Sequence, residues 1–309
     1  MGRKRAAEIC ADCFGTAVQK AHSRNYSRGC QEYLVKDPHE RDWQLLYDES
    51  IFAEPSRYTC RVELVSPICR YQDLELIEQL VTALKEKGRM KVNASCGLHV
   101  HVDGALFDAK KLRNLVNLMA GKESFLYRAL PVEASREAAY CKRLRGEFVQ
   151  ALNRQRPDTL EKLQAIWYET MKESWEKPAQ SRYYGLNLHS FFENGSIEYR
   201  MFPASDAPKR IRAMVELALM MTAQALNRTQ IHCQRKPAME EKAAVRAWLS
   251  RLGLVGTEFQ ETRELLLQQF ESAPDTAEQG QSRTLAEAYN WSRSSRQEEQ
   301  ESGYRGMLE

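Results

Sequence analysis

The chain has 309 residues, of which 43% are hydrophobic and 28% charged, a composition that supports a globular core. Lys and Arg number 45 against 42 Asp and Glu, so the formal net charge is only +3, which excludes a dedicated nucleic-acid-binding protein. No apolar run reaches the roughly 20 residues of a membrane-spanning helix, and the charged N-terminus does not have the pattern of a secretion signal. We therefore expect a cytoplasmic protein with no membrane partner.

Helices and strands are both predicted in the first third of the chain. Apolar residues at helical spacing, each time followed by a glycine at which the helix can end, predict helices at 3–14 before Gly15 and at 73–87 before Gly88. Runs of β-forming residues predict strands at 42–51 and 58–66. The polar segment 21–41 is expected to be a loop.

Residues 98–103 alternate strictly between apolar and polar side chains, which is typical of a strand with one buried face. One face holds Leu98, Val100 and Val102, and the other holds His99, His101 and Asp103. Two imidazoles at this spacing lie roughly 6–7 Å apart and can bind a metal ion or a phosphate group. Two solvent-facing histidines without a function are the alternative.

Helices dominate the rest of the chain, and they are expected at 109–119, 122–130, 208–226, 239–252 and 258–271, with a helical insertion at 136–177 that is interrupted near Pro157. Asn194-Gly195 between the β-like runs 183–192 and 197–202 predicts a hairpin. This order of elements favours an α+β fold, with a curved, mostly antiparallel sheet and flanking helices. We expect one catalytic domain at 1–272, followed by a polar, mobile tail at 273–309.

Other polar side chains on the predicted strands can act together with the histidines. Glu198 and Arg200 share one face of their strand, where a surface ion pair is the simplest explanation. Glu63 lies mid-strand between apolar neighbours, and the amides Asn93 and Asn187 beside strands either satisfy a turn or bind a substrate. A carboxylate can bind Mg²⁺ and a guanidinium can neutralise a phosphoryl group, so together with the histidines these residues indicate a magnesium and phosphate site.

These motifs resemble the amidoligase family, which comprises carboxylate–amine ligases with a glutamine synthetase-like fold. The resemblance spans residues 3–228 and rests on the segments Arg61 to Pro67, Asn93 to Asp103, Leu112 to Val116, Arg136 to Cys141, Leu186 to Leu188 and Ile197 to Phe202. The segment from Cys96 to Val102 is the most specific part, above all in combination with the Glu-x-Arg at 198–200.

The resemblance implies an ATP- and Mg²⁺-dependent enzyme that phosphorylates a carboxylate and joins it to an amine, with an amino acid or a peptide as substrate. The implied metal ligands are Glu63, His99 and Glu198. The implied catalytic residues are His101 and Arg200, which would bind the phosphates of ATP or the acyl-phosphate, and Arg136, a weaker match for binding phosphate or carboxylate. The implied neighbours for cofactor and substrate are Asn93 and Asn187.

One part of the family pattern is not matched. Members of the family open with a strand bearing Glu-x-Glu, which supplies further metal ligands and leads into a segment like Arg3 to Glu8. This sequence begins at Met1, directly before that segment, either because upstream coding sequence was left out or because the copy is degenerate. We therefore expect fewer carboxylates at the metal site and weak or no activity for this chain.

Two other functions are compatible with the same residues. A zinc-dependent hydrolase would use His99, His101 and Asp103 to activate water, although His189 is the only other histidine near a motif. An inactive amidoligase remnant would keep the fold and bind a partner through the helical insertion or the polar tail. Binding of Mg²⁺–ATP favours the ligase, retention of zinc favours the hydrolase, and neither favours the remnant.

Overall fold

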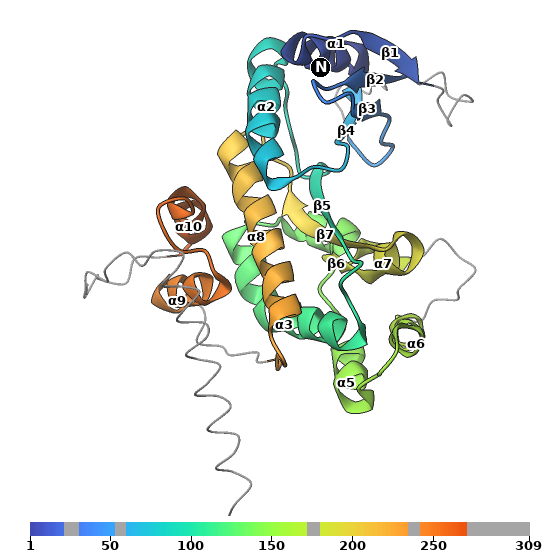
Figure 1. The fold of residues 1–309 in the computed structure, drawn as a ribbon, viewed down its shortest axis with the longest axis vertical. Helices are drawn as coiled ribbons and strands as arrows, with labels where there is room; N and C mark the ends of the chain where they lie inside the picture. Colours follow the sequence, from blue (N-terminus) through green and yellow to red (C-terminus); the bar gives the residue numbers. More distant parts are fainter. Residues whose placement is uncertain (22–30, 53–59, 172–179, 234–241, 271–309) are drawn as a thin grey trace, which may run out of the picture.

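The computed structural model describes residues 1–21, 31–52, 60–171, 180–233 and 242–270, which form two lobes (Figure 1). The smaller lobe holds the N-terminal helix and a sheet, and the larger lobe holds a second sheet and most of the helices. Helix α2 (Leu74–Gly88) joins the lobes, because it packs on α1 (Arg3–Phe14) in the first and on α8 (Pro208–Asn227) in the second.

The N-terminal lobe is a four-stranded antiparallel sheet with a helix packed on it. Its strands are hydrogen-bonded in chain order: β1 (Val18–Ala21), β2 (Glu32–Lys36), β3 (Asp42–Leu46) and β4 (Glu63–Val65). Helix α1 packs on β2 and β3, and α2 packs on α1. The core of this lobe includes the buried side chains of Ile9, Trp43, Leu45 and Leu80.

The larger lobe is organised by the antiparallel sheet β5-β7-β6 and by two long helices. Its strands are β5 (Gly97–Asp103), β6 (Leu186–Asn187) and β7 (Ser196–Pro203). Helix α3 (Ala109–Ala129) packs against α8, and α8 contacts β5. The shorter elements are η3 (Tyr71–Asp73), α4 (Ala134–Tyr140), α5 (Gly146–Gln155), α6 (Leu160–Thr170), η4 (Gln180–Tyr183), α7 (Leu188–Asn194), α9 (Lys242–Leu252) and α10 (Gln260–Leu267).

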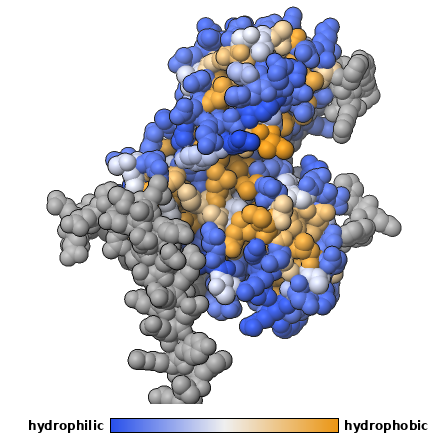
Figure 2. Space-filling view, viewed as in Figure 1, coloured by the Kyte–Doolittle hydropathy of each residue, from blue (hydrophilic) through white to orange (hydrophobic). Residues whose placement is uncertain are grey.

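The surfaces of the two lobes differ in the view of Figure 2. The N-terminal lobe presents a mainly hydrophilic surface, whereas apolar residues are visible in the middle of the larger lobe. Partly exposed apolar side chains that pack against the core of the larger lobe include Leu98, Val102 and Phe192. Within the described ranges, no helix is both long and apolar enough to cross a membrane.

The mixed α and β architecture with antiparallel strand pairing is confirmed, but the strands form two small sheets in place of one curved sheet. Within the described residues, no ladder of hydrogen bonds joins the last strand of the first sheet, β4, to the first strand of the second, β5. The expected strands at 42–51 and 58–66 are shorter than predicted and correspond to β3 and β4. Residues 58–59 and the tail at 273–309 lie outside the described residues.

Several helices follow the sequence pattern closely. The helix at 3–14 is confirmed, and Gly15 ends it in the left-handed region (φ 70°) while its N–H donates to the carbonyl of Ala11. The helix at 208–226 is confirmed as α8, with a proline at its start. The helices at 239–252 and 258–271 correspond to α9 and to the shorter α10, with residues 239–241 and 271 outside the described residues.

The predicted hairpin at Asn194-Gly195 is wrong. These residues end helix α7, and Gly195 (φ 73°) donates its N–H to the carbonyl of Phe191. A glycine with positive φ serves a tight hairpin and a helix end equally well, so the local signal cannot distinguish the two. The run predicted as a strand at 183–192 therefore contains only the two-residue strand β6 before α7 begins.

Three further boundaries differ from the prediction. The segment 21–41 contains β2, because this polar strand gains hydrogen-bonded partners on both sides, in β1 and β3. The helix after Asp73 includes Gly88 and ends at Arg89, which takes up the left-handed conformation itself (φ 50°). A Cβ at position 88 would meet the ends of the Met1 and Ile9 side chains, so any larger residue would require these side chains to move.

The helical part of the chain is divided differently from the prediction. Residues 109–129 form one continuous helix, α3, instead of two, because its buried face continues past Gly121. The insertion at 136–177 consists of three short helices, α4, α5 and α6, with residues 172–179 outside the described range. The expected break near Pro157 is confirmed between α5 and α6.

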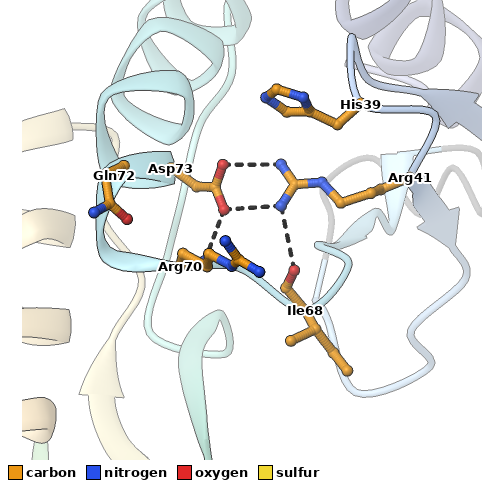
Figure 3. A pocket seen from close by; sticks show the side chains of 6 residues that line it. All are labelled: His39, Arg41, Ile68, Arg70, Gln72 and Asp73. Carbon is orange, nitrogen blue, oxygen red and sulfur yellow. Dashed lines mark hydrogen bonds and ion pairs between the residues drawn. The ribbon is translucent and has the colours of Figure 1, made fainter.

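A network around Arg41 ties the turn between β2 and β3 to the start of α2 (Figure 3). The guanidinium of Arg41 donates two hydrogen bonds to the carboxylate of Asp73, at 2.8 and 2.9 Å, and a third at 2.8 Å to the fully buried carboxylate of Asp37. Arg41 lowers the pKa of Asp73 from its ordinary 3.8 to about 2, because the pair favours the charged carboxylate. The surrounding open recess is lined by His39, Arg41, Ile68, Arg70, Gln72 and Asp73.

We expect Asp73→Asn to lower the free energy of unfolding by about 2 kcal/mol at neutral pH. The folded pKa lies below the unfolded one, so the contribution is complete above about pH 4 and is lost as the pH falls toward 2. Urea denaturation between pH 2 and 7 measures both effects. Asp158→Asn, which removes an exposed pair with Lys162, is the control and should leave stability unchanged. Equal stability of Asp73→Asn and the wild type at pH 7 would contradict this assignment.

Candidate active site

The pairing of β5 with β7 brings the sequence motifs together. His101 lies opposite Glu198 and Val100 lies opposite Tyr199, but Leu98 lies opposite Phe202. One residue of β7 is therefore extra, and Arg200 and Met201 together face His99 in a β-bulge. The bulge keeps Arg200 on the polar face and allows Phe202 to remain in the core.

The centre of the site is the carboxylate of Glu198, which is 4% exposed. Its Oε1 accepts a hydrogen bond from Nη1 of Arg200 at 2.6 Å and lies 3.5 Å from Nδ1 of His99 and 3.6 Å from Nε2 of His101. Its Oε2 accepts a hydrogen bond from the amide of Asn187 at 2.5 Å. We call these five residues the Glu198 cluster. The predicted common face for the two histidines, Glu198 and Arg200 is thus confirmed.

His99 is held in the neutral form at physiological pH. Burial and, after it, the nearby Arg200, Arg136, His101 and Arg182 together lower the pKa of its imidazole from 6.5 to about 3. A neutral imidazole near Glu198 interacts as a hydrogen-bonding or metal-binding group and not as a cation. The arginines around this imidazole carry positive charge, which favours an anionic ligand.

Glu63 approaches the Glu198 cluster from the N-terminal lobe. It lies on β4, and the charges of Arg200 and Glu198 both act on its carboxylate. Its pKa is raised, first by burial and then by the neighbouring carboxylate of Asp48. Within the described residues no hydrogen bond or ion pair joins Glu63 to the cluster. The site therefore lies where the two lobes meet.

The two predicted amides have different places. Asn187 belongs to the cluster, and because its Oδ1 also accepts the N–H of Ser190, it caps α7 while holding Glu198. Asn93 lies in an exposed turn before β5, where its Oδ1 accepts from Ser95 and its Nδ2 donates to the carbonyl of Phe52. The structure thus brings Asn187 to the site and leaves Asn93 outside the cluster.

Arg136 is buried at the end of the sheet, next to Gly97 on β5, and binds backbone. Its guanidinium donates to the carbonyls of Cys96, Arg200 and Phe202, on both sides of the bulge. Gly97 provides the space, since a Cβ there would lie 2.0 Å from Nη2 of Arg136. Burial lowers the pKa of Arg136, and the charge of Arg200 lowers it further. This side chain therefore stabilises the bulge that positions Arg200.

Sequence reasoning missed two residues at the site, Arg182 and Tyr183 at the end of η4. The ring centroid of Tyr183 lies 5.7 Å from Cζ of Arg200 and 5.0 Å from Cζ of Arg182. The sequence pattern places Tyr183 at the start of the predicted strand at 183–192 and Arg182 directly before it, and it indicates no contact of either residue with the site. The Arg-Tyr pair shortly before Asn187 was the available signal, but only the fold shows that it meets Arg200.

The carboxylates and imidazoles of the site suit magnesium better than zinc. Mg²⁺ in phosphate-transferring sites is bound by one or two carboxylates together with water and substrate phosphates, and Glu198 and Glu63 fit that mode. Zinc needs at least three protein ligands around one point, and the part of the chain that the structure describes contains no such group of His, Cys, Asp or Glu. Glu63, His99 and Glu198 do not form such a group either, so a magnesium ion here would need further ligands from water or substrate. Asp103 accepts the N–H of Ala105, and His189 contacts Tyr168 at 2.6 Å, so neither joins His99 and His101.

The structure thus brings a buried carboxylate, two arginines and two histidines together on an antiparallel sheet, a set of groups that can interact with a charged ligand. The sequence matches the family described as "putative amidoligase enzyme" over residues 1–222. The chain therefore belongs to the amidoligase family. No curated protein and no solved structure matches the chain.

Arg136→Ala should lower the free energy of unfolding by about 3 kcal/mol, because it leaves three backbone carbonyls without their donor. Arg136→Lys, which retains the charge but not the planar group, should lose less. Urea denaturation provides the measurement, and Lys162→Ala on the surface of α6 is the control that should not change stability. If Arg136→Ala kept full stability and lost ligand binding, Arg136 would be a ligand-binding residue instead.

Proposed function

We propose that this chain uses ATP and Mg²⁺ to join a carboxylate to an amine, with an amino acid or a peptide among its substrates. The observation that carries this proposal is the Glu198 cluster, in which Arg200 and two imidazoles surround one oxygen of a buried carboxylate. Membership of the amidoligase family supports the ligase class. The guanidinium of Arg200 beside this carboxylate supports phosphoryl transfer, where cations offset the charge of the transferring group.

Arg200 is the best-placed residue to bind the transferring phosphoryl group. Glu198 and the ring of Tyr183 hold its guanidinium in place. The side chain of Arg200 is 11% exposed, so part of it remains accessible to a ligand. A guanidinium held in this way can bind phosphoryl oxygens without reorganising during the reaction.

Glu198, Glu63 and His99 would hold the metal ion. Asn187 fixes the orientation of the Glu198 carboxylate, as supporting hydrogen bonds do in metal sites. The neutral state of His99 leaves a nitrogen lone pair to coordinate a metal ion. When bound, ATP would transfer its γ-phosphoryl group to the carboxylate with ADP as the leaving group, and the amine would then displace inorganic phosphate and lose a proton to give the amide.

His101 has a more exposed position than His99 and faces the ligand side of the sheet. Its side chain is 50% exposed, its Nε2 lies near Glu198, and its Nδ1 lies 3.1 Å from the hydroxyl of Ser196. Ser196 in turn contacts the hydroxyl of Ser190 at 3.0 Å, which fixes the ring from the far side. His101 can therefore bind a phosphate oxygen or the acyl-phosphate in a defined orientation.

Glu198→Gln should weaken the binding of Mg²⁺–ATP at least tenfold, because a metal-binding carboxylate is lost. The same change should leave the binding of ATP without magnesium equal or tighter, since it removes a negative charge from a positively charged site. Arg200→Ala should weaken the binding of ATP both with and without magnesium. Isothermal titration calorimetry with and without Mg²⁺ measures these affinities, and binding can be tested whether or not the chain turns over ATP.

Glu137→Gln is the matched control. Glu137 lies on α4 and pairs with Arg143, and its substitution should leave the affinity for ATP unchanged. Thermal unfolding of each variant checks that the fold is retained. The proposal is wrong if the wild type binds no Mg²⁺–ATP. Zinc retained through purification would instead favour a hydrolase, and binding of neither would favour a remnant.

A further inference from the structure

Arg182 belongs to none of the motifs that define the site, yet it lies beside the Glu198 cluster. Its Cζ is 5.0 Å from the ring centroid of Tyr183, and Cζ of Arg200 is 5.7 Å from the same centroid. Two guanidinium groups therefore share one aromatic ring.

Backbone hydrogen bonds connect the end of η4 to β7 and so place Arg182 with respect to Arg200. The N–H of Lys142 donates to the carbonyl of Tyr183 at 2.7 Å, and the N–H of Gly185 donates back to Lys142 at 2.8 Å. The N–H of Arg200 then donates to the carbonyl of Gly185, also at 2.8 Å. The two arginines are thus held on one continuous piece of hydrogen-bonded backbone.

The three arginines near the site differ in how their charge is compensated. Arg200 donates to the carboxylate of Glu198, and Arg136 donates to three backbone carbonyls. Arg182 is exposed and, within the described residues, forms no ion pair with a carboxylate. Stacking of one arginine on a tyrosine is common on protein surfaces, but a second guanidinium on the same ring adds repulsion. An anion that contacts both guanidinium groups would offset this repulsion.

We propose that Arg182 binds a phosphate oxygen of a nucleoside triphosphate together with Arg200, with Tyr183 as the ring on which both guanidinium groups rest. This inference rests on the proposed function and deepens it, because it adds a specific ligand-binding residue. The planar guanidinium can form two parallel hydrogen bonds to one phosphate group, which lysine cannot. The exposed position of Arg182 leaves it accessible to a ligand that enters from solvent.

Calorimetry with Mg²⁺–ATP and with inorganic pyrophosphate tests this inference on the full chain. Arg182→Ala should weaken the binding of both ligands about 10- to 100-fold, the effect of losing a charged hydrogen bond to a phosphate. Arg182→Lys should weaken them less, because it keeps the charge but not the planar group. Arg154→Ala, at an exposed arginine of α5 for which no contact is recorded in the described part of the chain, is the control and should bind like the wild type.

The outcomes separate this inference from the proposed function. If the wild type binds Mg²⁺–ATP and Arg182→Ala binds it equally well, Arg182 does not have the proposed role, and the proposed function stays intact. In a second outcome, the wild type binds pyrophosphate but not ATP, and Arg182→Ala does not bind pyrophosphate. This result supports the role of Arg182 and overturns the proposed function. If the wild type binds neither ligand, both are wrong. Arg182 is exposed, so its variants should fold, and thermal unfolding checks this.

Discussion

The buried carboxylate of Glu198 is the constraint on which the site depends. A buried charge is stable only when donors and cations surround it, and here Asn187 and Arg200 donate to it directly. Satisfying one carboxylate thereby fixes the start of α7, the conformation of Arg200 and the positions of two imidazoles. If Glu198 lost its charge, Arg200 would become an uncompensated cation beside Arg136.

The β-bulge in β7 makes this arrangement compatible with the hydrophobic core. In a regular pairing, Phe202 would fall on the same face as Arg200, whereas the extra residue returns Phe202 to the core opposite Leu98. The guanidinium of Arg136 supplies the donors that carbonyls around the bulge would otherwise lack. A buried arginine that binds backbone carbonyls thus supports the strand conformation on which the site depends.

The meeting of the two lobes places further charge at the site. Glu63 comes from the sheet of the N-terminal lobe, while Arg182 and Tyr183 come from η4 in the larger lobe. The N-terminal lobe is in turn held to α2 by the pair of Arg41 with Asp73, at a distance from the chemistry. Electrostatic interactions between segments far apart in sequence therefore define both the architecture and the site.

The sequence by itself determined those features that depend on side-chain period. Alternation along β5 and along β7 was enough to put His99 with His101 and Glu198 with Arg200 on common faces, and helical spacing was enough for α1 and α8. Only the tertiary structure decided which strand pairs with which, and this determined that Arg136 binds backbone, that Asn93 serves a turn and that Arg182 lies near Arg200. Asn194-Gly195 shows the physical reason: a left-handed glycine suits a hairpin and a helix end equally, and only packing and long-range hydrogen bonds select one of them.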